Sequence, residues 1–264
     1  MIWEEFFAII VAGVFCGFVD SSLGMGYGVT SATVLVSFGV SPAAASASVH
    51  TAEAFVDVIS AGSHLKFGNV RKDLLSPLLI CGTTGAVLGA AGLSYLSLSV
   101  AKPIVASVLL CMGLLIFVKF IFMRKEGRSY SRSDVEDVYY SRKKLAALSF
   151  VAGFIDASGG GGWGPILTPT FVATGSSPKK AVGTVEFSEP IISFATFLTF
   201  GILIGFENFL WSIVLPMLIG GIILTPLAAY LCSKTPRRLM GVLVGLWVAV
   251  LNIRTLVTVI MAQF

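Results

Sequence analysis

The sequence predicts an all-α polytopic membrane protein built from two inverted-topology repeats. Its composition is 56% hydrophobic and 12% charged, whereas a soluble domain carries about 25% charged residues. Several apolar runs reach the ~20 residues that a helix needs to span a bilayer, and they lack the alternating polarity of barrel strands. The third observation is a glycine-rich motif that occurs twice. Each repeat is expected to hold a broken or re-entrant helix pair followed by three spanning helices.

The first half of the chain predicts five helical segments. Its opening apolar run leads into a glycine-rich stretch, Gly17 to Gly28, where we expect the helix to be interrupted. Ser41 and Pro42 suit the N-cap and the first position of a later helix. The polar residues 64–73 predict a loop. The expected segments are 3–19, 29–38, 42–63, 74–95 and 99–123.

The second half repeats this plan. Residues 124–144 form a polar region too short for a hydrophobic core, so they predict a connecting loop. They separate a first transmembrane repeat, 1–123, from a second, 145–264. The expected segments of the second repeat are 145–155, 165–173, 178–200, 209–231 and 239–260.

The two glycine-rich stretches lie 136 positions apart. Gly17 to Gly28 aligns with Gly153 to Gly164, and fourteen identities join 17–58 to 153–194 without a gap. These identities include an Asp, a Ser-Pro pair and a Glu in register, which convergent composition does not explain. The halves are therefore an internal repeat.

The distribution of Lys and Arg predicts the orientation in the membrane. The loops at 64–73, 124–144 and 233–238 are basic, whereas 201–208 and the N-terminal flank contain no Lys or Arg. Basic loops face the cytoplasm. We therefore expect the N-terminus outside, the central loop cytoplasmic and the C-terminus outside, with the halves inverted. The N-terminus lacks the basic region of a cleaved signal and is expected to remain.

Short, glycine-interrupted helices at matching places in inverted repeats indicate a transporter's binding site. A helix over 29–38 would be about 15 Å long, half the ~30 Å hydrocarbon core, so its N-terminus would lie at depth and attract an anion. The alternative is that the glycines only allow close helix packing and that the two aromatic residues simply pack. The predicted substrate-binding residues are Ser22, Gly24, Gly26, Tyr27 and Gly28, with Ser158, Gly160, Gly162, Trp163 and Gly164.

Ionisable residues in the helices after the breaks predict proton coupling or bracing of the breaks. His50 and Glu53 share one face of a helix, and their repeat counterparts are Glu186 and Glu189. Polar groups at this depth are costly and mark pathways or proton relays. His50 with Glu186 is the preferred proton-coupling pair. Glu53 and Glu189 could equally brace the breaks through hydrogen bonds.

Four further charged positions lie in or after the breaks. Asp20 and Asp156 would repel an anion while ionised, so we expect them to brace the breaks or to take a proton. Asp57 lies one turn after Glu53 and could join the same set. Arg254 could pair with a carboxylate, guard a pore or extend to the interface. The four cysteines show no CxxC spacing, so neither a metal nor a cofactor is expected.

The pattern GFxD-x-S-x-G-x-G-[YW]-G occurs twice, each time followed by Ser-Pro and a helix with Glu. It resembles the TauE/SafE family of sulfite and organosulfonate exporters, the four-toluene sulfonate uptake permease group, over nearly the whole chain. The second copy has Ala157 where the first copy has Ser21. This difference argues against identical roles for the two copies. The resemblance implies an inner-membrane transporter of small sulfur-containing anions, such as sulfite or sulfoacetate. It also implies proton coupling.

Other functions remain alternatives at this point. A passive anion channel or a carrier for short organic carboxylates would use the same features. A membrane enzyme is disfavoured because no HExxH or cysteine cluster is present. The net charge of +4 arises from loop residues, which indicates orientation rather than nucleic-acid binding. The expected partners are a small anion, the lipid bilayer and protons. The oligomeric state is open, a homodimer being one possibility.

Overall fold

The computed structural model describes residues 3–122, 140–232, 234 and 237–261, and within them it contains helices and no strands. The first half holds α1 (Trp3–Leu23), α2 (Tyr27–Ser37), α3 (Pro42–Lys66), α4 (Leu75–Tyr95) and α5 (Leu98–Ile121). The second half holds α6 (Arg142–Gly159), α7 (Trp163–Ala173), α8 (Pro178–Ile204), α9 (Trp211–Leu231) and α10 (Arg237–Met261). Short 3-10 turns, Lys72–Leu74 and Phe206–Asn208, precede α4 and α9. The all-α fold class is confirmed.

Six of the described helices, α1, α4, α5, α8, α9 and α10, are long and apolar enough to cross a bilayer. The chain is therefore a polytopic membrane protein. The helix α2 has only 11 residues, too few to span. The helix α3 has 25 residues, but it carries His50, Glu53 and Asp57, which are buried inside the protein.

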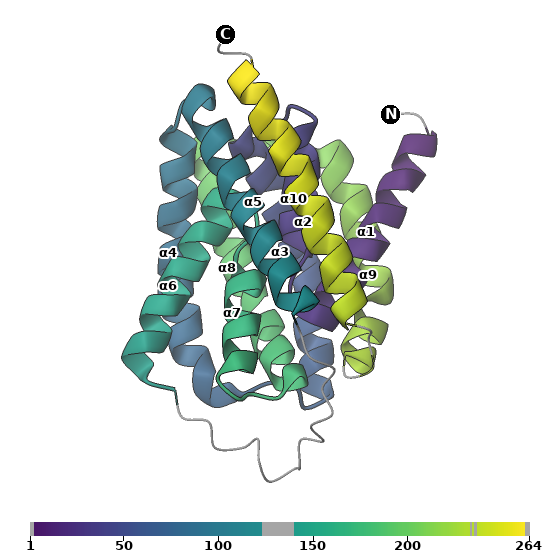
Figure 1. The fold of residues 1–264 in the computed structure, drawn as a ribbon, viewed down its shortest axis with the longest axis vertical. Helices are drawn as coiled ribbons and strands as arrows, with labels where there is room; N and C mark the ends of the chain where they lie inside the picture. Colours follow the sequence, from purple (N-terminus) through teal and green to yellow (C-terminus); the bar gives the residue numbers. More distant parts are fainter. Residues whose placement is uncertain (1–2, 123–139, 233, 235–236, 262–264) are drawn as a thin grey trace.

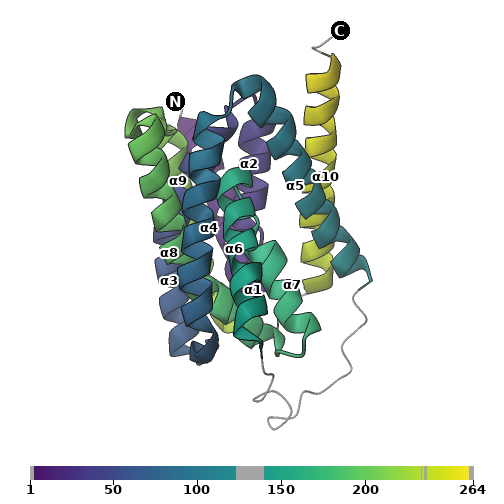
Figure 2. The same ribbon diagram turned by 90° about the vertical axis from the view of Figure 1, so that its left-hand side faces the viewer.

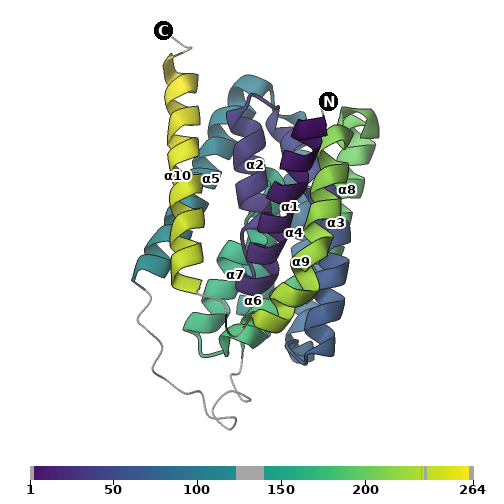
Figure 3. The same cartoon turned by 90° about the vertical axis from the view of Figure 1, so that its right-hand side faces the viewer.

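The helices pack in pairs that the internal repeat relates to one another. The helix α4 packs on α6, and α1 packs on α9 (Figures 2 and 3). Exchanging the two halves converts one of these pairs into the other. The pairs α3 with α8 and α5 with α10 are unchanged by the exchange. This pairing is what two halves related by a two-fold axis would produce.

Repeat-related helices also run in opposite directions. In Figure 1, α1 begins at the upper end of the molecule, whereas its counterpart α6 begins at the lower end. The last turn of α10 lies at the same end as the first turn of α1. These directions are those that an inverted repeat requires. The orientation relative to a membrane stays a prediction.

The break in each repeat is shorter than the sequence predicted. Residues 17–23 remain helical, and the chain leaves the helix only at Gly24, which has φ +69°. Its counterpart Gly160 has φ +78°. Polar residues alone do not stop a helix, whereas a left-handed residue does, and that conformation favours glycine.

The predicted connecting loop also needs one correction. Its last three residues, 142–144, form the first turn of α6, because basic side chains at a helix end reach water without leaving the helix. The part of the prediction that falls on 124–139 lies outside the described residues.

Close helix packing relies on glycines. A Cβ on Gly85 or Gly89 of α4 would meet the backbone of Phe150 or Phe154 in α6, and one on Gly17 of α1 would meet Gly221 of α9. Small residues let membrane helices approach backbone to backbone. The α4–α6 and α1–α9 contacts therefore hold the two halves of the repeat together.

Candidate functional site

The two short helices α2 and α7 begin next to each other in the buried centre. A Cβ on Gly28 would lie 2.8 Å from the carbonyl oxygen of Gly160, and one on Gly164 would lie 2.8 Å from the Cα of Met25. Thr168 of α7 donates its hydroxyl to the carbonyl oxygen of Gly24 at 2.8 Å. The structure thus brings the two predicted breaks into direct backbone contact.

Each break is braced by the aspartate that precedes it. Asp156 Oδ1 accepts hydrogen bonds from the backbone amides of Gly162, at 2.7 Å, and Trp163, at 3.0 Å. In the other half, Asp20 Oδ1 accepts one from the amide of Tyr27 at 3.1 Å. Both carboxylates therefore accept hydrogen bonds from helix N-terminal amides. The sequence had predicted that these amides would bind the substrate anion. These hydrogen bonds support a bracing role for both aspartates, which stays a prediction.

The two predicted serines turn away from the contact between the breaks. Ser22 donates its hydroxyl to the carbonyl of Val19 in its own helix at 3.1 Å. Ser158 does the same toward the carbonyl of Phe154 at 2.6 Å. In this conformation neither hydroxyl is presented to a ligand between the breaks.

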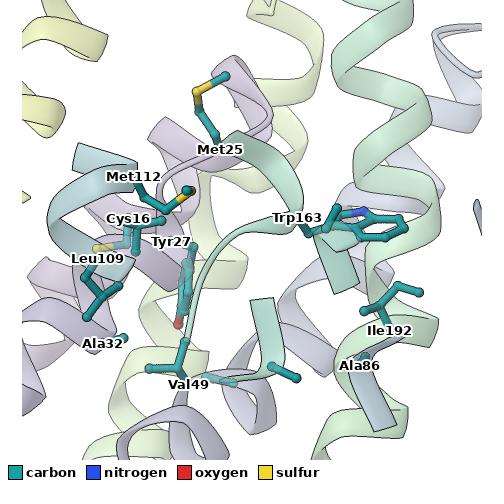
Figure 4. Packing of buried hydrophobic residues seen from close by; sticks show 14 of the residues in the cluster. Cys16, Met25, Tyr27, Ala32, Val49, Ala86, Leu109, Met112, Trp163 and Ile192 are labelled. Carbon is teal, nitrogen blue, oxygen red and sulfur yellow. The ribbon is translucent and has the colours of Figure 1, made fainter. Parts of the chain in front are cut away.

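The two predicted aromatic residues lie fully inside the protein. Tyr27 and Trp163 are both 0% exposed, and Figure 4 shows them within the apolar cluster. Tyr27 donates its hydroxyl to the Met217 carbonyl at 3.2 Å, and the indole N–H of Trp163 points to the Val185 carbonyl at 3.4 Å. Their polar atoms are satisfied by backbone carbonyls, and both side chains are packed beside the breaks.

His50 lies on the break of the second half. Its Nε2 is 3.0 Å from Asp156 Oδ2, and its Nδ1 is 2.9 Å from the carbonyl oxygen of Ser46. A carbonyl oxygen only accepts hydrogen bonds, so Nδ1 donates to it. A second proton must then lie between Nε2 and Asp156, on one partner or the other. The hydroxyl of Ser46 fixes this corner further by donating to the Ala157 carbonyl at 2.7 Å.

The predicted pair of His50 with Glu186 is replaced by two separate contacts. His50 meets Asp156, whereas Glu186 Oε2 accepts a hydrogen bond from Ser60 at 2.5 Å. The hydroxyl of Ser60 also lies 2.9 Å from that of Ser21. The tertiary structure therefore divides the predicted ionisable set into two clusters, one beside each break.

The second cluster is acidic. Carboxylate oxygens of Asp20, Glu186 and Glu189 lie within 4.8 Å of one another, and all three side chains are buried. Glu53 lies toward the contact between the breaks, where its Oε1 would be 2.8 Å from a Cβ on Gly28. Both carboxylate oxygens of Asp57 are buried and lack a hydrogen-bond partner among the described residues.

Sequence reasoning missed the hydroxyl groups that connect these clusters. Ser46 precedes His50 by one helical turn, a spacing that could have pointed to it. Ser60 and Thr168 reach across to other helices, and nothing in the local sequence identifies their partners. Arg254 is exposed on the surface of α10. Of its three predicted roles, extension of the side chain to the membrane interface is the one that fits this position.

A cavity of about 710 Å³ lies away from the breaks, between α1, α2, α9 and α10. Its walls are mainly apolar and include Phe15, Phe38 and Trp247. Such a lining suits hydrocarbon rather than a small hydrophilic anion. The breaks and their polar clusters therefore remain the candidate site for a charged substrate.

Comparison with known proteins gives two matches. The family model described as sulfite exporter TauE/SafE matches residues 9–255. A Bacillus subtilis (strain 168) protein named "Probable membrane transporter protein YtnM" is 45% identical over 246 residues, which is 93% of this chain and 80% of that protein. No solved structure gave a significant match.

Proposed function

The chain belongs to the TauE/SafE sulfite exporter family of membrane transporters, and on that premise we propose that it carries small sulfur-containing anions, such as sulfite and sulfoacetate, by alternating access. The family and its probable membrane transporter relative support transport rather than catalysis. The observation that supports this proposal is the meeting of two helix N-termini from different repeats in the buried centre. Transporters of inverted-repeat architecture bind anionic groups at such ends.

The substrate anion would bind where the two breaks separate. In the present conformation Gly28 packs on Gly160, and Asp156 occupies the first amides of α7. An anion could take those amides only after the carboxylate of Asp156 is displaced or neutralised, because two negative charges would otherwise share one buried site. Movement of one repeat against the other would supply the space.

Proton coupling follows from the same contact. The proton shared by His50 and Asp156 would neutralise the carboxylate and let an anion approach the α7 N-terminus. Loss of that proton would restore the negative charge and expel the anion, so the two would be carried together.

The proposed location is the inner membrane, with both termini outside. The Lys and Arg residues of loops 64–73 and 233–238 support it, and so does the placement of the α1 start and the α10 end at one end of the molecule (Figure 1).

Transport in proteoliposomes tests the proposal. Uptake is measured for sulfite, thiosulfate, sulfoacetate, taurine and short carboxylates with and without an imposed pH gradient. We expect uphill accumulation of one or more sulfur-containing anions, driven by the gradient. Gly24→Val is the inactive control, since Gly24 needs φ +69° and its Cβ would lie 2.8 Å from the hydroxyl of Thr168.

Two other results of the transport assay would change the proposed function. Flux that only equilibrates the anion would indicate a passive channel, which the tight contact between the breaks disfavours. Accumulation of short carboxylates in preference to every sulfur-containing anion would replace the substrate class while keeping the carrier mechanism.

A further inference from the structure

The internal repeat provides two equivalent positions that differ in charge. Asp20 and Asp156 are counterparts, and each braces the first amides of a short helix. Beside Asp156, the repeat position is His50, which meets it at 3.0 Å. Beside Asp20, the corresponding position is Glu186. A carboxylate thus stands where the other half has a basic ring.

A second difference between the halves adds negative charge near Asp20. Asp57 in the first half corresponds to Ser193 in the second. Asp20 and Glu186 act electrostatically on Asp57, and Asp57 acts on Glu189, so Asp57 adds a fourth acid to the neighbourhood of Asp20, Glu186 and Glu189. Buried carboxylates without a compensating positive charge are very costly. The acidic position therefore has to be neutralised by a cation or by protons, and it lacks the basic ring that stands at its counterpart.

The spacing of the carboxylates suits a single ion. Oxygens that coordinate one hard cation at about 2.4 Å can be at most about 4.8 Å apart. Carboxylate oxygens of Asp20, Glu186 and Glu189 all lie within 4.8 Å of one another. Asp20 lies on α1, and Glu186 and Glu189 lie on α8, so the ligands of one ion would come from two helices.

Unsatisfied oxygens point to a ligand independently of this spacing. Glu186 Oε1 and Glu189 Oε2 are buried and have no hydrogen-bond partner among the described residues, and their residues are only 0% and 5% exposed. The hydroxyl of Ser60 already occupies Glu186 Oε2. Native proteins leave few such atoms unpaired. One oxygen of each glutamate therefore remains for coordination.

The backbone favours the same sign of charge. Asp20 lies in the last turn of α1, which ends at Leu23. The C-terminal end of a helix carries partial negative charge and attracts cations. In transporters with broken helices, such ends coordinate Na⁺ or H⁺.

We propose that Asp20, Glu186 and Glu189 form a binding site for a hard cation that prefers oxygen ligands, with Na⁺ the ion whose single charge matches the one proton that lies between His50 and Asp156 at the counterpart position. The sequence had indicated no metal site, because Asp20 lies far along the chain from Glu186 and Glu189. The site goes beyond the proposed anion transport and does not depend on which anion is carried.

Thermal unfolding of the purified protein in detergent, without any anionic substrate, tests the site. Na⁺, Ca²⁺, K⁺ and choline are compared as chlorides at matched ionic strength. A ligand that binds only the folded state raises the melting temperature with its concentration. We expect Na⁺ or Ca²⁺ to do so beyond choline, and the stronger of the two identifies the class of ion.

Substitutions of the proposed ligands show whether the cation binds at this site. Glu189→Gln and Asp20→Asn should each weaken the apparent cation affinity by about ten-fold or more, since even outer partners of metal ligands contribute that much. Asp156→Asn is the charge-matched control, because it removes the same charge from the counterpart position without removing a proposed ligand, and it should lose much less cation affinity than Asp20→Asn. Asparagine retains an oxygen for the helix amides in both cases.

Two results would overturn the proposal. One is a wild-type protein that responds identically to Na⁺, Ca²⁺ and choline, which would mean that the carboxylates hold shared protons instead. The other is an unchanged response in Glu189→Gln and Asp20→Asn. If those variants do not fold, binding of radioactive sodium to the wild-type protein decides, with unlabelled Na⁺ as competitor and choline as control. Failure of the transport assay would leave these binding results unaffected.

Discussion

Asp156 holds His50 with one carboxylate oxygen and the N-terminus of α7 with the other. The Oδ2–Nε2 distance is 3.0 Å, and Oδ1 accepts from the amides of Gly162 and Trp163. A change in the proton between the two side chains therefore acts directly on the group that braces the break. This contact links an ionisable pair on α3 and α6 to the proposed anion position.

The first prediction concerns His50→Gln. Uptake driven by a pH gradient should fall about ten-fold or more, because a hydrogen bond to a charged group is worth ~1.5–3 kcal/mol and glutamine cannot carry the proton. The measurement is initial uptake into proteoliposomes with and without the gradient.

His64→Gln is the control for this variant. His64 is the other histidine of the chain, and it is also buried on α3, where it contacts the Ser21 carbonyl. It should leave the ratio of uptake with and without the gradient unchanged. An equal loss of that ratio in both variants would contradict a specific role for His50.

The second prediction concerns the contact between the breaks. A methyl group at Gly28 would lie 2.8 Å from both Glu53 Oε1 and the Gly160 carbonyl oxygen. Gly28→Ala should therefore destabilise the protein by about 1–3 kcal/mol through overpacking and abolish most transport. Flux is measured at equal amounts of protein in the membrane.

Gly62→Ala is the matched glycine substitution. Gly62 lies in α3, and a Cβ there would meet no atom within 4 Å, so helix propensity would make alanine neutral or stabilising by up to ~1 kcal/mol. Flux should be unchanged. Normal transport by Gly28→Ala would remove the breaks from the transport pathway.

The third prediction compares two glycines of α4. A Cβ on Gly82 would overlap the ring of Trp163 and lie 3.0 Å from Ile192 Cδ1, whereas one on Gly92 would meet nothing within 4 Å. Gly82→Ala should lower the free energy of unfolding by about 1–3 kcal/mol. Gly92→Ala should not lower it. Thermal unfolding in detergent measures both.

A double variant shows whether the ring is the cause. Trp163→Phe removes part of the ring that faces Gly82, so the combined effect of Gly82→Ala and Trp163→Phe should be smaller than the sum of the two single effects. Strict additivity would show that the cost at Gly82 arises elsewhere.

The fourth prediction concerns orientation. In a background with the four native cysteines replaced, Lys72→Cys and Asn208→Cys place single thiols at exposed positions at opposite ends of the helices. A membrane-impermeant maleimide should label the thiol at 208 in intact cells and the thiol at 72 only after permeabilisation. The reverse labelling pattern would invert the proposed topology.

The helices could be predicted well because their signals are local. The sequence placed α4 over 74–95 and α9 over 209–231, and the structure has Leu75–Tyr95 and Trp211–Leu231. The length of an apolar run and a Ser-Pro start belong to adjacent residues. The break was predicted too long, since helical geometry continues through Asp20 and Ser22 until a residue with positive φ ends it.

The sequence by itself determined the membrane class, the repeat and the positions of the ionisable residues along their helices, because each depends on residue order alone. Only the tertiary structure decided that His50 meets Asp156 and that Glu186 and Glu189 meet Asp20. Those contacts join α3 to α6 and α1 to α8. They depend on how each helix is rotated about its axis and how the two halves are placed against each other, and packing across the whole molecule sets both.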